Sequence, residues 1–194
     1  MRSAQRLRPA GSDRRRRFEA LAEMVFDPLQ RYLRRRLGPE DAADVLSDTL
    51  LVIWRRLDEV PTDDPLPWCY GVARRTMANH RRGRRRHLQL VTRLEAEPAP
   101  PPVEVGVDDG DPDLIEALDR LRAADQEILR LWAWEGLEPR ELAPVLGLTV
   151  NAATIRLSRA RKKLAAALAP RDVGQDRAVS GQESVRHTEE HQDD

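Results

Sequence analysis

Residues 138–164 (EPRELAPVLGLTVNAATIRLSRARKKL) constrain the fold most, because they contain two helical patterns separated by a turn of about three residues. Pro139 stands at a favourable first helical position, and apolar residues then recur at helical spacing. Gly147 can adopt the positive φ that ends this helix, and Thr149 can cap the next helix through its hydroxyl. The stretch therefore predicts a helix-turn-helix.

The second helix of this motif has an apolar stripe, predicted to face the core, that consists of Ala153, Leu157, Ala160, Leu164 and Leu168. Its opposite face and flanks carry Asn151, Thr154, Ile155, Arg156, Ser158, Arg159, Arg161, Lys162 and Lys163. No acidic residue occurs between Glu141 and Asp172, whereas a solvated helix face usually mixes both signs of charge. This face favours binding in the major groove of duplex DNA over an ordinary solvated surface.

The formal net charge of zero hides a strong asymmetry along the chain. Residues 1–90 hold 20 Arg against 12 acidic residues, and residues 91–112 hold one Arg against six. Residues 113–170 are nearly balanced, and residues 171–194 hold three Arg against seven acidic residues. A basic N-terminal unit is thus followed by an acidic segment, a mixed unit and an acidic tail.

Strand patterns are almost absent, and the sequence predicts an all-α chain. Besides the helix-turn-helix, we expect helices at 15–36, 40–57, 67–82, 113–122 and 125–135. Pro28 should bend or restart the first of these helices.

These helices predict two small domains, an N-terminal helical bundle (15–87) and a C-terminal four-helix domain (113–169). The Pro-rich, acidic segment 88–112 cannot bury enough apolar surface to fold and is interpreted as a flexible linker. The basic segment 1–14 and the acidic tail 170–194 are predicted to be disordered.

Several classes of protein are excluded by composition. The single cysteine, Cys69, cannot form an intramolecular disulfide, and the four histidines have no zinc-ligand spacing. No cofactor or metal is therefore predicted. No run of about 20 apolar residues and no signal-peptide core occurs, so we expect a cytoplasmic protein with no membrane partner.

The first unit carries a second nucleic-acid pattern, in which aromatic residues lie close to arginines. Trp54 and Trp68 fall on apolar faces, which favours core positions for both over base stacking. The helix that follows has a basic edge without acidic residues, and phosphate contacts are expected from Arg74, Arg75, Arg81 and Arg82.

Asp44 and Asp48, four residues apart, allow three interpretations. No histidine or third carboxylate accompanies them, which disfavours catalysis or metal binding against a solvated helix face. The third interpretation is a protein-docking surface, because Leu51 lies between charged residues on the same face.

Three motifs in order, DAADVLSDTLLVIWRRLDEV, PWCYGVARR and GLTVNAATIRLSRARKKL, resemble those of bacterial RNA polymerase sigma factors of the sigma-70 family, extracytoplasmic-function (group IV) type. The resemblance covers about residues 15–86 and 113–168. It implies a sigma factor without catalytic residues, whose region 2 binds core RNA polymerase and opens the −10 promoter element. Region 4 would recognise the −35 element as duplex.

Site residues follow from the resemblance position by position. The residues implied to meet the coiled coil of the largest polymerase subunit are Asp44, Val45, Asp48, Leu51 and Arg55. Loop 58–66 would capture a flipped −10 base, and the −10 set comprises Asp63, Asp64, Arg74, Arg75, Asn79 and Arg82. The −35 set comprises Asn151, Thr154, Ile155, Arg156, Ser158, Arg159, Arg161 and Lys162.

Further partners implied are the flap of the second largest polymerase subunit and an anti-sigma factor around which the two domains fold. The chain departs from the family pattern at Ser47 (usually Gln), Cys69 (usually Leu), Arg75 (often Asn) and residues 151–153 (usually Gly-Thr-Val).

Two rival functions remain open at this point. An autonomous helix-turn-helix regulator would bind duplex DNA as a dimer without polymerase, although the sequence shows no spare apolar helix for dimerisation. An enzyme acting on nucleic acid through Asp44 and Asp48 would require a metal ion for cleavage.

Overall fold

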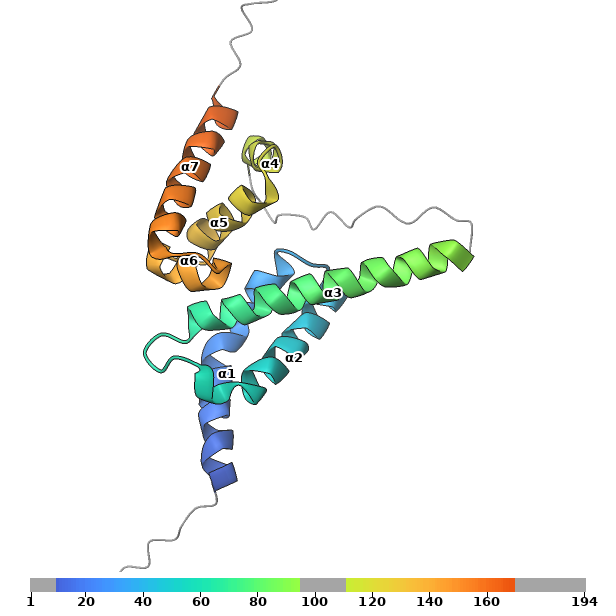
Figure 1. Ribbon diagram of the computed structural model, residues 1–194, viewed down its shortest axis with the longest axis vertical. Helices are drawn as coiled ribbons and strands as arrows, with labels where there is room; N and C mark the ends of the chain where they lie inside the picture. Colours follow the sequence, from blue (N-terminus) through green and yellow to red (C-terminus); the bar gives the residue numbers. More distant parts are fainter. Residues whose placement is uncertain (1–9, 95–110, 170–194) are drawn as a thin grey trace, which may run out of the picture.

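The computed structural model describes residues 10–94 and 111–169, and every structural statement below concerns these two ranges. Within them the chain is entirely helical, as predicted (Figure 1). The elements are α1 (Ala10–Arg34), α2 (Pro39–Arg55), the 3-10 helix η1 (Leu57–Glu59), α3 (Leu66–Leu94), α4 (Pro112–Asp119), α5 (Ala123–Trp134), α6 (Pro139–Leu146) and α7 (Val150–Leu168). The predicted disorder of the two chain ends and most of the predicted linker lie outside the described residues.

Helices α1, α2 and α3 pack against one another to form the first unit. Their facing sides bury large apolar residues such as Leu29, Tyr32 and Ile53. The expectation that Pro28 restarts the first helix is wrong, because α1 continues through it. Val25 and Leu29, on either side of Pro28, are fully buried, and this packing holds the helix together where the proline removes a backbone hydrogen bond.

Helix α3 is longer than the sequence predicted. It continues past residue 82 to Leu94 and so extends into the segment interpreted as a linker. Arginine is a good helix former and the run from Arg81 to Arg86 contains no proline, so the single Gly83 weakens the helix without ending it. The long C-terminal half of α3 projects beyond α1 and α2 (Figure 1).

The second unit consists of α4 to α7, and its helix-turn-helix forms as predicted. Gly147 has a φ of 67° at the end of α6, and the hydroxyl of Thr149 accepts a hydrogen bond of 3.2 Å from the backbone N–H of Ala152. The side chains and backbones of Glu138 and Glu141 form a reciprocal capping box that begins α6. These local signals fix the angle between α6 and α7.

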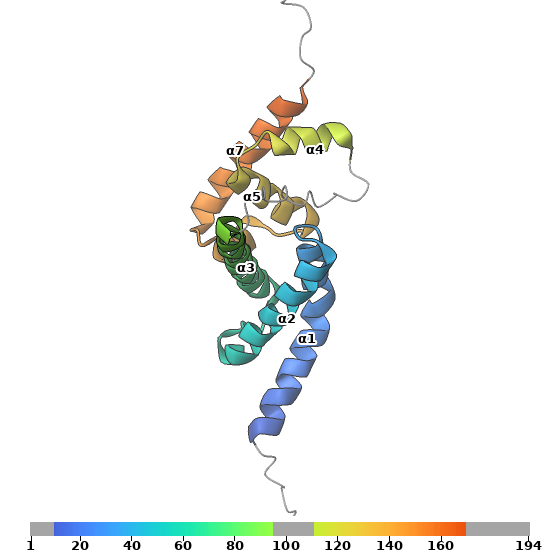
Figure 2. The ribbon, with the colours of Figure 1, turned by 90° about the vertical axis from the view of Figure 1, so that its right-hand side faces the viewer.

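The two units are packed together in one arrangement, here called the closed arrangement (Figure 2). Helix α6 lies against α3, and buried residues of both units form one continuous apolar cluster. The backbones approach closely at Gly71, where an added Cβ would lie 3.6 Å from the Cα of Val145. A Cβ would fit there in ordinary contact, but a side chain larger than that of alanine would collide with the α6 backbone.

Candidate nucleic-acid interface

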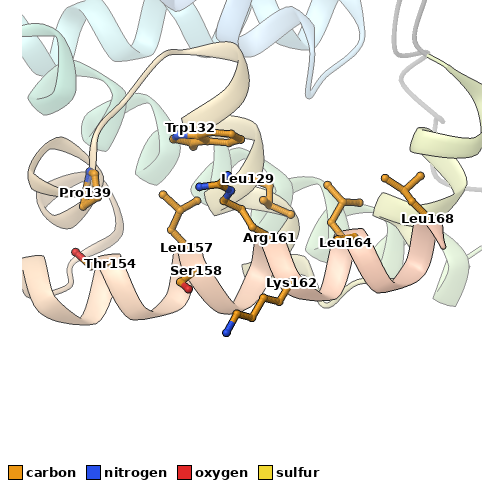
Figure 3. Close-up of a pocket in the computed structure, with 11 residues that line it drawn as sticks. Leu129, Trp132, Pro139, Thr154, Leu157, Ser158, Arg161, Lys162, Leu164 and Leu168 are labelled. Atoms are coloured by element: carbon orange, nitrogen blue, oxygen red, sulfur yellow. The ribbon is translucent and has the colours of Figure 1, made fainter.

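The outer face of α7 is exposed and basic, as the sequence predicted. Ala153, Leu157 and Ala160 are buried beneath it. Of the residues predicted to contact duplex DNA, Arg156 is half-buried, and the exposed ones are Asn151, Thr154, Ile155, Ser158, Arg159, Arg161 and Lys162. Figure 3 shows Lys162 pointing away from α5, whereas Leu157 and Leu164 point towards it. The face is therefore available to a groove of DNA.

Two basic side chains of α7 interact with α5. The Arg161 guanidinium stacks 4.8 Å from the ring centroid of Trp132, and the Lys163 ammonium lies 2.5 Å from an Asp125 carboxylate oxygen. The sequence analysis did not single out Trp132 or Asp125. Trp132 is 39% exposed and borders an apolar groove of about 680 Å³ between α5 and α7 (Figure 3).

The basic edge of α3 forms a second candidate surface. Arg75, Asn79 and Arg82 are exposed and Arg74 is half-buried, while the side-chain amide oxygen of Asn79 accepts a hydrogen bond from Arg82. The residues of the predicted base-capturing loop, Asp63 and Asp64, are exposed in the turn before α3.

The two tryptophans of the first unit already have partners within the chain. Trp54 packs edge-on against Phe18, with ring centroids 5.2 Å apart, and Arg14 stacks on the Trp54 ring. Arg56 lies 5.4 Å from the ring centroid of Trp68. Both rings are half-buried, which agrees with the interpretation that they serve the core more than base stacking.

Helix α2 displays a surface made of Asp44, Asp48, Leu51 and Arg55. All four are exposed, Leu51 by 45%, and none of the three charged members has an ion pair among the described residues. Val45, predicted to share this surface, is instead fully buried, because its position on the helix points into the core. Its side chain is therefore not part of the exposed α2 surface.

Cys69 and Tyr70 lie in the core of the first unit rather than at any surface. Burial raises the pKa of the Cys69 thiol to about 12. Burial, followed by the charge of Glu135, raises the pKa of Tyr70 to about 12. Both groups are neutral near pH 7 and act as packing residues. The residues described include no group of three or more histidine, cysteine or acidic side chains that could hold a metal ion.

A buried ionic cluster joins the two units, and the sequence analysis missed it. Arg36 donates to Glu127 at 3.2 Å and to Glu135 at 3.1 Å, and its side chain is 3% exposed. Arg35 also pairs with Glu135 at 3.1 Å, and the Tyr32 hydroxyl donates to Glu127 at 3.1 Å. These five residues are called the Arg36 cluster. Its bonded pairs join residues 91 to 100 positions apart in the sequence, so no local pattern could reveal their pairing.

Comparison with known proteins identifies two regions of one family in this chain. The family model for Sigma-70 region 2 matches residues 21–87, and the model for Sigma-70, region 4 matches residues 112–164. The RNA polymerase sigma factor NccH of Alcaligenes xylosoxydans xylosoxydans is 30% identical over 136 residues, which cover 66% of this chain and 73% of NccH. CnrH of Cupriavidus metallidurans, also an RNA polymerase sigma factor, is 29% identical with the same coverage of each chain.

Solved structures show the same fold. CnrH in complex with the cytosolic domain of CnrY is 28% identical, with a TM-score of 0.53 over 79% of this chain and 88% of CnrH. The sigma factor RpoE of Bartonella quintana, in complex with the anti-sigma factor NepR, is 25% identical, with a TM-score of 0.57 over 78% of this chain and 96% of RpoE. No helix in the described part of the chain is long and apolar enough to cross a membrane.

Proposed function

Because the chain belongs to the sigma-70 family of RNA polymerase sigma factors, of the extracytoplasmic-function type, we propose that it directs core RNA polymerase to specific promoters and catalyses no reaction itself. The observation that carries the proposal is the exposed face of α7, the second helix of a capped helix-turn-helix, which has no acidic residue. Arginine and lysine on such a face bind phosphates, and short polar side chains such as Thr154 and Ser158 can reach base edges in the major groove.

The α3 surface supports a second DNA contact. Exposed arginines and Asn79 along one helix edge suit the backbone and bases of a single strand. The family assigns this region to the −10 element, and the exposed loop carrying Asp63 and Asp64 lies immediately before it. Residues 15–87 would form region 2, which binds the −10 element, and residues 113–169 would form region 4, which binds the −35 element.

The α2 surface is the proposed contact with the coiled coil of the largest polymerase subunit. An exposed leucine among unpaired charges provides both apolar area and electrostatic steering. The flap of the second largest subunit would meet the second unit, and the chain would act in the cytoplasm with RNA polymerase. Since the similar CnrH and RpoE structures contain CnrY and NepR, we also include an anti-sigma factor among the partners.

The proposal is tested by mixing the purified chain with bacterial core RNA polymerase, followed by gel filtration and run-off transcription on genomic fragments. The expected result is co-elution and transcripts that start at defined sites. Tight binding to duplex DNA without polymerase, in the absence of co-elution, would instead support the autonomous helix-turn-helix regulator.

A matched pair of variants tests the α2 surface. Leu51→Ala removes an exposed side chain from the proposed docking surface, whereas Met24→Ala removes one that is 59% exposed on α1. We expect Leu51→Ala to weaken co-elution with core polymerase by roughly tenfold, as an interface anchor does, and Met24→Ala to leave it unchanged. Equal effects of the two variants would disprove the assignment of this surface.

A further inference from the structure

A cleft of about 690 Å³ separates α3 from α5, and its walls carry six arginines from both units. These are Arg74, Arg75, Arg81, Arg82 and Arg85 on α3, and Arg130 on α5. The only carboxylate on its walls is that of Glu127. The cleft exists because the closed arrangement places α5 opposite the basic edge of α3.

The charge of the cleft is not neutralised by its own walls. Glu127 already accepts hydrogen bonds from Tyr32 and Arg36, which belong to the Arg36 cluster. Arg81 donates to the backbone carbonyl of Arg36 at 2.7 Å, which is an uncharged acceptor. None of the five cleft arginines on α3 has an ion pair within the described ranges.

Arg130 is the least satisfied of the six. Its Nε atom is buried without a hydrogen-bond partner among the described residues, and its Nη2 atom has only a long ion pair of 4.0 Å with Asp119 there. Burial, followed by the positive charge of Arg36, lowers the pKa of Arg130. A buried donor without an acceptor is costly, and like charges facing each other across an interface oppose its closure.

The size and chemistry of the cleft limit what can fill it. Its volume falls in the range of about 300–1,000 Å³ typical of small-molecule sites, and a DNA duplex cannot enter it. Guanidinium groups bind phosphate oxygens through paired, charge-assisted hydrogen bonds. Six of them around one small space require a ligand with several negative charges.

We propose that the cleft binds a small oligophosphate, with at least three phosphate charges, that bridges the arginines of α3 and Arg130 of α5. Such a ligand binds only when both units face each other, so it stabilises the closed arrangement by mass action. It also occupies the arginines assigned above to the −10 element, so it competes with promoter DNA; this consequence alone rests on the proposed function.

The first experiment titrates the full chain with inorganic tripolyphosphate in a calorimeter, at constant ionic strength. We expect Arg130→Gln to weaken binding at least tenfold, although it lies on the unit opposite α3. Unchanged affinity of Arg130→Gln would overturn the proposal, because the arginines of α3 alone would then suffice.

Two neighbouring arginines on α3 provide a second test that does not depend on whether Arg130→Gln folds correctly. Arg85 lines the cleft, whereas the adjacent Arg86 is exposed and does not. Arg85→Gln should weaken tripolyphosphate binding several-fold and Arg86→Gln should not, although both remove one charge from the same helix. Equal losses in both variants would mean nonspecific attraction to a basic surface and would overturn the site.

Separate titrations identify the source of the phosphate chain. Equal affinity for tripolyphosphate and a purine nucleoside triphosphate supports a site for the phosphate chain alone, and tighter binding of the nucleotide supports a nucleotide site. A single-stranded oligonucleotide that binds the wild type while tripolyphosphate does not would overturn the proposal in favour of a nucleic-acid surface. None of these titrations needs polymerase, so their failure leaves the transcription test of the proposed function unaffected.

Discussion

The chain has two basic surfaces that are alike in composition and different in access. The face of α7 lies on the outside of its unit, with Asn151, Ser158 and Arg159 exposed. The arginine edge of α3 instead faces α5 across a cleft, and a partner must enter between the two units to reach its full length. On the proposed function, a duplex approaches α7 in the closed arrangement, whereas a strand that contacts the cleft side of the α3 arginines as well as the exposed Arg75, Asn79 and Arg82 is expected to separate the units. The difference teaches that one packing contact can limit access to one basic surface and leave the other free.

The largest expected effect comes from breaking the Arg36 cluster. Arg36→Met removes the main partner of Glu135, whose side chain is 3% exposed, and of the half-buried Glu127, and losing one member of a buried ion pair costs about 3–5 kcal/mol. We expect a lower midpoint in urea unfolding and a larger radius of gyration as the units separate. Arg34→Met, which changes the exposed last residue of α1, two positions before Arg36, is the control, and an identical result for both variants would contradict a role for the cluster.

A smaller effect is expected at the close contact between α3 and α6. Gly71→Leu introduces a side chain against Val145 and should cost about 1–3 kcal/mol by overpacking. Gly71→Ala should be tolerated, because its Cβ would make ordinary contacts of 3.4 Å or more. Hydrogen exchange of the α6 backbone amides measures the loosening, and protection that stays unchanged in Gly71→Leu would show that this contact does not hold the units together.

For the outer face of α7 we expect a substitution to change DNA binding rather than stability. Arg159→Ala should weaken binding of holoenzyme to a −35 duplex by about 1–3 kcal/mol and make binding less dependent on salt. Arg120→Ala removes an exposed arginine of the same unit that pairs only with Glu116, and it serves as the matched control. Fluorescence anisotropy over a range of salt concentrations distinguishes the two, and equal losses would argue against recognition by α7.

The smallest expected effect at neutral pH is the pH dependence of stability that comes from the core of the first unit. The folded-state pKa values of Cys69 and Tyr70 are raised to about 12, above their ordinary values of about 8.5 and 10. Their contribution to stability is complete below about pH 8 and is lost as pH rises towards 12, because the unfolded chain releases these protons first. The free energy of unfolding in urea, measured between pH 7 and 11, should follow this decline. In a separate experiment, iodoacetamide should alkylate Cys69 at pH 8 only as fast as the protein opens. Rapid alkylation would contradict its burial.

Local patterns in the sequence were sufficient to predict the helices, the capped turn and the basic face of α7. Gly147 and Thr149 act through neighbours one to four residues away, which is the range that a sequence pattern describes. The contacts between units could not be predicted in this way. Glu127 and Glu135 look like ordinary solvated acids until the fold brings Arg36 to them, and the same holds for Trp132 beneath Arg161.

Some errors had a local origin. Val45 was grouped with the α2 surface by its position in a family motif, whereas its helical phase directs it into the core. The end of the helix expected at 67–82 was set too early, because the arginine-rich segment that follows it also favours helix and continues α3 to Leu94.

The most direct test of the difference in access is the distance between the two units, measured by spin labels at Asp27→Cys and Ala166→Cys. Both positions are exposed and outside the proposed contact sites, and the buried Cys69 should remain unlabelled. The free chain should show one narrow distance distribution for the closed arrangement, and a complex with core polymerase and promoter DNA should show a clearly longer distance. An unchanged distance in a complex that initiates transcription would contradict the account, because promoter binding would then not require the units to separate.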